Sequence, residues 1–197
     1  MKFTEMQFKI IDKSIDLIAE RGIQGFTIKN LAAKLGLTEG AIYRHFKSKE
    51  EILLSIIKIF QAEASKTLEN ACSTKYPAME KITKIFNHHF NFFAEKPSVA
   101  SVIFSESIFQ NKHSLSKEVK KLLNMHEEAL LCIIKSGQDS GEIINGKIRK
   151  EELVKIIIGS IRYTVTKWRL SNFKGDIIKE GNKLLNTVKY ILTIKMD

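Results

Sequence analysis

Hydrophobic residues recur at intervals of three and four positions along most of this chain, which is the spacing of one face of an α-helix. The first such pattern ends at Gly22, and capping residues or prolines separate the later ones. The chain has no β-hairpin pattern and no internal repeat. We therefore predict an all-α fold of about nine helices, with approximate bounds 4–21, 27–36, 38–46, from 49, from 76, from 97, 114–140, 150–170 and 176–195.

Residues 27–51 hold three helix starts and two glycines in a short stretch. Thr27 and Thr38 each suit an N-cap, because a hydroxyl oxygen can accept a hydrogen bond from an unpaired backbone N–H. Gly36 lies between them, where a residue without a Cβ permits a tight turn. Ser48 and Glu51 have the spacing of a capping box at the start of a longer helix. These signals predict a helix-turn-helix.

The chain has 197 residues, of which 44% are hydrophobic, and a net charge of +10. This length suits a small domain joined to a larger one, and we predict a helix-turn-helix domain at 1–48 and a helical domain at 49–197. No apolar run approaches the roughly 20 residues of a membrane span, and the charged N-terminus does not resemble a signal peptide. We expect a cytoplasmic protein that does not act on a membrane.

Positive charge is concentrated in the helix-turn-helix rather than spread evenly. Between positions 27 and 49 a single acidic residue, Glu39, accompanies Lys29, Lys34, Arg44, Lys47 and Lys49. Gly40 and Ala41 open the third helix, and their small size permits close approach to base edges in a DNA major groove. A solvated basic helix is the alternative, but the coincidence of caps, turn and charge favours double-stranded DNA as the ligand.

The run "GIQGFTIKNLAAKLGLTEGAIYRHFKSKEEIL" and the amphipathic helix before it resemble the N-terminal domain of the TetR family of bacterial transcriptional regulators. The resemblance covers residues 5–55. It implies a homodimer that binds a near-palindromic operator, most often as a repressor, and leaves it when an effector enters the C-terminal domain. By position, the family's phosphate contacts fall on Thr27, Tyr43, His45 and Lys49, and its base-reading positions fall on Lys29, Thr38, Gly40, Ala41 and Arg44.

The last two predicted helices are candidates for a dimer interface. The helix at 150–170 is apolar on more than one face, and the helix at 176–195 carries a continuous apolar stripe. A monomer core is the alternative, but the family resemblance implies a four-helix interface between two subunits. The predicted interface residues are Ile161, Val165, Leu184, Leu185, Val188, Ile191 and Leu192.

Three ionisable residues lie on otherwise apolar stripes of the helices between these regions. They are His89, Glu106 and His126. A buried carboxylate needs a partner, and two imidazoles with a carboxylate can ligate a zinc-like divalent ion. A Glu–His hydrogen bond or outward-facing side chains are the alternatives. No cofactor is required by the sequence, and a divalent metal ion or a polar effector group remains a hypothesis.

An effector pocket of unknown ligand is predicted in the same region, with an aromatic and apolar wall suited to drugs, fatty acyl chains or aromatic compounds. Its candidate residues are Phe86, His89, Phe90, Phe93, Phe104, Glu106, Phe109, His126, Tyr163 and Trp168. Such aromatic stripes also occur in ordinary cores. The chain has no phosphate-binding loop, nucleophile elbow or H-E-x-x-H motif, so we do not expect an enzyme. A dimer controlled by a protein partner, without a small-molecule effector, is the alternative regulator.

Overall fold

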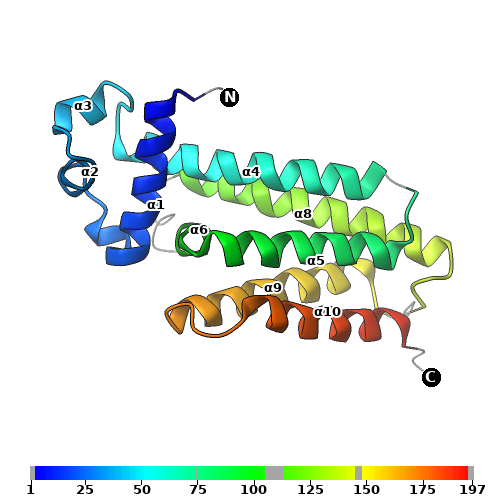
Figure 1. Ribbon diagram of the computed structural model, residues 1–197. Helices are drawn as coiled ribbons and strands as arrows, with labels where there is room; N and C mark the ends of the chain where they lie inside the picture. The colour runs from blue at the N-terminus through cyan, green and yellow to red at the C-terminus, as the bar shows by residue number, and fades with distance from the viewer. Residues whose placement is uncertain (1–2, 74, 105–112, 145–147, 195–197) are drawn as a thin grey trace. The chain divides into compact units, whose positions relative to one another are not determined.

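A computed structural model describes residues 3–73, 75–104, 113–144 and 148–194 of the chain (Figure 1). These residues form helices and no strands, so the predicted all-α class is confirmed. The helices are α1 (Glu5–Gly25), α2 (Ile28–Leu35), α3 (Glu39–Tyr43), α4 (Lys49–Ser73), α5 (Ala78–Glu95), α6 (Pro97–Ile103), α8 (His113–Asp139), α9 (Lys150–Leu170) and α10 (Ile177–Thr193).

The chain divides into two compact units. One comprises Met1–Ala62 with Pro97–Lys120, and the other comprises Glu63–Lys96 with Lys121–Asp197. This division differs from the predicted domains at 1–48 and 49–197, because the first half of α4 and the α6 segment pack with the N-terminal helices. We call the two parts the N-terminal unit and the C-terminal unit. No helix of the described residues is long and apolar enough to cross a membrane.

The N-terminal unit is built around one hydrophobic core to which every helix contributes. Ile10 and Leu17 come from α1, Ile52 and Ile56 come from α4, and Val102 comes from α6; each is at most 2% exposed. The first helix is interrupted at Gly22, whose φ of +65° breaks the helical path at the predicted stop. The break directs the chain from α1 toward α2.

In the C-terminal unit, α5 packs along α10 (Figure 1). Phe90 of α5 lies against Gly181 of α10, where the absence of a side chain lets the ring approach the helix backbone. The start of α5 is capped from a distant part of the chain: the Glu142 carboxylate accepts hydrogen bonds from the backbone N–H groups of Ala78 at 2.5 Å and Met79 at 2.9 Å. The cap satisfies two amides that a helix start otherwise leaves unpaired.

Replacement of Gly181 by alanine should destabilise the C-terminal unit. An added Cβ would lie 2.5 Å from Cδ2 of the Phe90 ring, well inside van der Waals contact. Displacing this packed ring should lower the free energy of unfolding by about 1–3 kcal/mol. Chemical denaturation followed by circular dichroism measures the change. Asn182→Ala, at the next and exposed position, is the control and should shift stability by less than about 0.5 kcal/mol; equal effects of the two variants would contradict the packing.

Candidate functional site

Three capping contacts define the helix-turn-helix. The Thr27 hydroxyl accepts a hydrogen bond from the Asn30 backbone N–H at 3.1 Å, and the Thr38 hydroxyl accepts one from Ala41 at 3.2 Å. Between them Gly36 adopts φ +66° and ψ 32°, the left-handed conformation that ends α2. The two predicted N-caps and the turn glycine therefore fix where α2 begins and ends and where α3 begins.

The inner face of this unit determines which residues face outward. Phe26, Leu31, Ile42 and Phe46 are buried, with at most 2% of their surface exposed. Because these side chains fix the rotation of α2 and α3, the opposite faces of both helices are directed to solvent. The candidate base-reading residues Lys29, Thr38, Gly40 and Arg44 are exposed, and Ala41 is half-buried.

Gly40 has no role in packing. A Cβ built at this position would meet nothing within 4 Å, and its φ is not positive. The glycine is therefore not required by the fold, and its small size matters only to a molecule that approaches α3 from outside. This is the property that a major-groove contact needs.

The candidate phosphate-contacting residues are held by different parts of the unit. Tyr43 is 49% exposed. The His45 carbonyl accepts a hydrogen bond from the Gln7 side chain at 3.1 Å, which ties the end of α3 to α1. Lys49 Nζ lies 3.4 Å from the Ile23 carbonyl oxygen and 5.1 Å from the centre of the Phe26 ring, and partial burial lowers the pKa of this amine.

One basic residue of the stretch does not belong to this surface. Lys34 forms an ion pair with Glu20 of α1 at 2.7 Å, so its charge is offset within the protein. Lys29, Arg44 and Lys47 are exposed and form no ion pair with another described residue. The positive surface is therefore smaller than the residue count along the sequence indicates.

The predicted effector-pocket residues separate into distinct locations. Phe86, Phe90 and Phe93 are buried in the C-terminal unit. The prediction is corrected for Tyr163, which is 68% exposed on α9. It is also corrected for Trp168, whose ring packs against Phe173 at 4.9 Å between centroids and whose indole N–H donates to the Gly175 carbonyl.

Three further candidates cannot be placed in that pocket. Phe104 is half-buried and belongs to the N-terminal unit. Glu106 and Phe109 lie outside the described residues.

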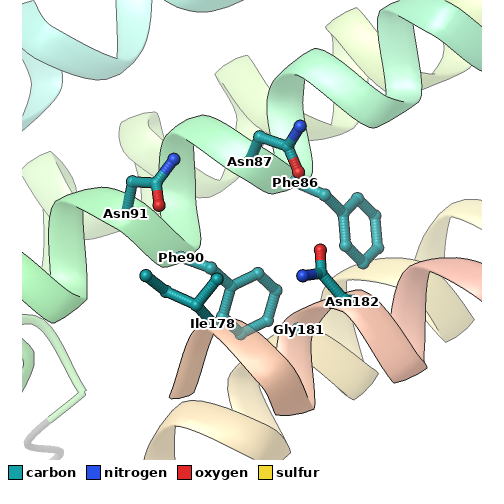
Figure 2. Close-up of a pocket in the computed structure, with 7 residues that line it drawn as sticks. All are labelled: Phe86, Asn87, Phe90, Asn91, Ile178, Gly181 and Asn182. Atoms are coloured by element: carbon teal, nitrogen blue, oxygen red, sulfur yellow. The ribbon is translucent and has the colours of Figure 1, made fainter. Parts of the chain in front are cut away.

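A groove of about 250 Å³ lies between α5 and α10. Its lining residues are Phe86, Asn87, Phe90, Asn91, Ile178, Gly181 and Asn182 (Figure 2). Figure 2 shows the two phenyl rings directed from α5 toward α10, with the asparagine amides at the rim. Sequence reasoning missed the three asparagines, although the spacing of four between Asn87 and Asn91 places them on one face of a helix.

A second hollow of about 310 Å³ is lined by residues of α4 and α8 in the C-terminal unit. Its walls include Leu68, Cys72 and Met125, together with the carboxylates Glu69 and Glu128. Two acidic residues at the wall disfavour an anionic ligand there.

The two predicted inward-facing histidines do meet. His89 Nε2 of α5 lies 2.8 Å from His126 Nε2 of α8. Burial, followed by repulsion from His126, lowers the pKa of His89 to about 3, and burial also lowers the pKa of His126. A tetrahedral zinc ion bound by both rings at about 2.0–2.1 Å would hold the two Nε2 atoms about 3.3 Å apart, so the contact of 2.8 Å is too short for such a site. Within the described part of the chain, no three His, Cys, Asp or Glu side chains form a group that could hold a metal ion.

The predicted dimer stripe also needs correction. Val165, Leu185, Val188 and Leu192 are at most 5% exposed within the single chain, because they form the subunit core with α5 and the other helices. They have no surface to offer to a second copy. Ile161, Leu184 and Ile191 are half-buried. The predicted stripe is a buried face, as its periodicity indicates, but it packs inside the subunit instead of against a second copy.

The apolar surface of α9 lies on another face. Ile156, Tyr163 and Leu170 are exposed, and Gly159 lies between the first two with no atom within 4 Å of an added Cβ. These four positions recur at intervals that place them on one side of the helix. Tyr190 of α10 is also exposed, at 66% of its surface.

An all-helical chain with a capped helix-turn-helix, an outward basic face and a separate helical unit belongs to the class of helix-turn-helix DNA-binding regulators. Comparison with known proteins specifies the family. Residues 10–56 match the family described as "Bacterial regulatory proteins, tetR family", and residues 60–191 match the "YsiA-like protein, C-terminal region". The chain belongs to the TetR family and is a transcriptional regulator with a C-terminal ligand-binding domain.

Relatives extend over nearly the whole chain. This chain is 30% identical over 178 residues to the fatty acid metabolism regulator protein of Bacillus subtilis (strain 168), and the matched region covers 90% of each protein. The crystal structure of the transcriptional regulator FadR from Bacillus subtilis in complex with stearoyl-CoA matches with 29% identity and a TM-score of 0.80, over 95% of this chain and 99% of that one.

A more distant structure shares the fold. The ketosteroid transcriptional regulator KstR2 of Mycobacterium tuberculosis matches with a TM-score of 0.83 at 16% identity, over 98% of both chains. The matched relatives named here are transcriptional regulators rather than enzymes.

Proposed function

We propose that this protein represses genes of fatty acid metabolism and is released from its operator by a long-chain acyl-CoA. The observation that carries the proposal is the 30% identity over 90% of both lengths with a fatty acid metabolism regulator. FadR from Bacillus subtilis, which is 29% identical to this chain, was crystallised in complex with stearoyl-CoA. The protein would act in the cytoplasm, on operator DNA, with no catalytic role and no required cofactor.

The candidate DNA-binding residues of the helix-turn-helix form two groups, one that contacts bases and one that contacts phosphates. We assign five residues to base edges because they lie on the outer faces of α2 and α3 or cap the ends of α3: Lys29, Thr38, Gly40, Ala41 and Arg44. We assign Thr27, Tyr43, His45 and Lys49 to phosphates, which fix the register of the protein on the duplex.

The effector part of the proposal is supported by the chemistry of the C-terminal unit. The buried rings of Phe86, Phe90 and Phe93 supply apolar surface for an acyl chain. The groove beside Phe86 and Phe90 has a volume of about 250 Å³, below the roughly 300–1,000 Å³ of common ligand sites. We therefore propose that the acyl chain enters a more open conformation of this unit, and that selecting this conformation weakens DNA binding.

The dimeric part of the proposal uses the exposed face of α9. Ile156, Gly159, Tyr163 and Leu170 form an apolar stripe with a glycine near its middle, which permits close approach of a second helix. An isologous contact of this stripe and the neighbouring Tyr190 with the same residues of a second copy would form a two-fold dimer, matching a near-palindromic operator.

Lys49→Ala should weaken operator binding at every sequence tested. Loss of one phosphate contact should lower the slope of log K against log salt by about 0.9. Fluorescence anisotropy with labelled operator, repeated at several salt concentrations, measures both quantities. Lys13→Ala is the control, since Lys13 of α1 pairs with Asp16 at 2.9 Å and lies outside the proposed surface. Unchanged operator affinity for both Lys49→Ala and Tyr43→Phe would exclude this face as the DNA surface.

Tyr163→Glu should convert the dimer into monomers, because it places two carboxylates in an apolar contact around the two-fold axis. Sedimentation velocity measures the mass of the particle in solution, and operator affinity should fall with it. Leu123→Glu, at an exposed position of α8, is the control and should leave the dimer intact. A Tyr163→Glu variant that sediments as the wild type does would place the interface elsewhere.

Stearoyl-CoA should release the protein from its operator, and acetyl-CoA and free CoA should not. Each methylene buried contributes about 0.8 kcal/mol, so affinity should rise roughly fourfold per methylene until the cavity is filled. Anisotropy with operator and a series of acyl chain lengths gives the release curve. A ligand specific to the folded protein should also raise its melting temperature. If no chain length shifts either quantity, control by a protein partner becomes the better account.

A further inference from the structure

His89 and His126 form a chain of three short polar contacts that runs from α5 to α8 within the C-terminal unit. The Nδ1 atom of His89 lies 2.8 Å from the Ile85 carbonyl oxygen, and the Nδ1 atom of His126 lies 2.8 Å from the Leu122 carbonyl oxygen. The two Nε2 atoms lie 2.8 Å from each other, with the rings in an edge-to-face arrangement. All three distances are those of hydrogen bonds.

Each of these contacts needs a proton between its two heavy atoms. A carbonyl oxygen can only accept, so both Nδ1 atoms must carry hydrogen. Two neutral imidazoles have two N–H groups, and both are used by the carbonyls. The Nε2 atoms then face each other with lone pairs only, and no exchange of tautomers solves this, because it would strip the proton from a carbonyl contact.

We propose that His89 and His126 share a third proton between their Nε2 atoms, so that the pair carries one positive charge and joins α5 to α8. The pair then is an imidazolium hydrogen-bonded to an imidazole, and all three contacts are satisfied. This hydrogen bond, donated by a charged group, offsets part of the cost of burying the charge. The proposal does not depend on the identity of the effector or of the operator.

Burial opposes any positive charge on the pair, and a second charge most strongly, because the two charged rings would also repel each other. Burial and the charge of His126 oppose protonation of His89, and the nearby His88 of the same helix acts in the same direction. For His126 of α8, burial opposes protonation and the Leu122 carbonyl favours it. Among the described residues, His88 is the one outside the pair whose charge acts on it. No carboxylate of the described residues is close enough to offset a positive charge on the pair. The two rings titrate as one unit that holds a single extra proton.

This state has a consequence for stability in acid. Well below the ordinary histidine pKa of about 6.5, the unfolded chain binds two protons at these residues, whereas the folded pair holds one. Stability therefore falls as the pH decreases, by the one proton that separates the two states. A neutral folded pair would differ from the unfolded chain by two protons, and its stability would fall twice as steeply.

Nitrogen-15 spectra of the imidazoles in the intact protein test the proton directly near pH 5, within the range used for the variant below. We expect protonated shifts for Nδ1 of both rings, and for the two Nε2 atoms shifts between the protonated and unprotonated values. Unprotonated shifts for both Nε2 atoms at that pH would overturn the proposal. His88→Gln is the control for assignment, because it removes the neighbouring imidazole and should leave the signals of the pair in place.

His126→Gln supplies an independent count of protons. The introduced amide can donate to His89 Nε2 without an extra proton, so the folded variant binds none at the pair and its unfolded chain binds one. With a shared proton, wild type and variant both differ by one, and the ratio of their folding equilibrium constants stays constant between about pH 5.5 and 4.5. With a neutral wild-type pair, the folding equilibrium constant of the wild type divided by that of the variant would fall about tenfold for each unit by which the pH decreases.

Elemental analysis of protein purified without a metal column tests whether a metal ion, and not a proton, lies between the two Nε2 atoms. We expect no stoichiometric zinc or other transition metal. One metal ion per chain, lost in His126→Gln, would place a metal rather than a proton between the rings and would overturn the proposal.

Discussion

The recognition surface depends on the burial of four side chains. The helices α2 and α3 have eight and five residues, too few for either to be stable in water by itself. Phe26, Leu31, Ile42 and Phe46 hold them in the core that α1 and α4 complete. Because this core sets the rotation of both helices, it also determines that Lys29 and Arg44 face outward. The packing that stabilises the fold therefore also determines which residues face the DNA.

The chain separates residues that maintain the fold from residues left for a ligand. Thr27 and Thr38 cap helices while lying at the surface, so each serves the fold and remains available to DNA. Gly40 contributes nothing to packing, whereas Gly181 is required for the contact with Phe90. A side chain could therefore be added at Gly40 without a clash inside the protein, whereas at Gly181 it would collide with Phe90. The sequence alone does not distinguish these two kinds of glycine.

Much of this architecture follows from local sequence. The N-caps Thr27 and Thr38, the turn at Gly36 and the bounds of α9 at 150–170 were predicted from capping and periodicity, which act within one or two turns. The predicted family is confirmed. The meeting of His89 and His126 also followed from their places on apolar stripes.

Other features depend on contacts between distant segments, and local patterns do not determine those. The cap of α5 comes from Glu142, some sixty residues away, and the Lys34–Glu20 pair removes one charge from the basic surface. The dimer stripe was displaced because an apolar residue can face its own core or another subunit, and periodicity gives the same signal for both. Val188 and Tyr163 illustrate the two outcomes.

The proposed function requires one protein to bind both a near-palindromic operator and a long-chain acyl-CoA. Selection of fragments of the source genome by the purified protein, in parallel with and without stearoyl-CoA, tests both halves. The account predicts enriched near-palindromes beside genes of fatty acid metabolism, and loss of this enrichment when stearoyl-CoA is present. Fragments without a shared near-palindrome, or an enrichment that stearoyl-CoA leaves unchanged, would contradict it.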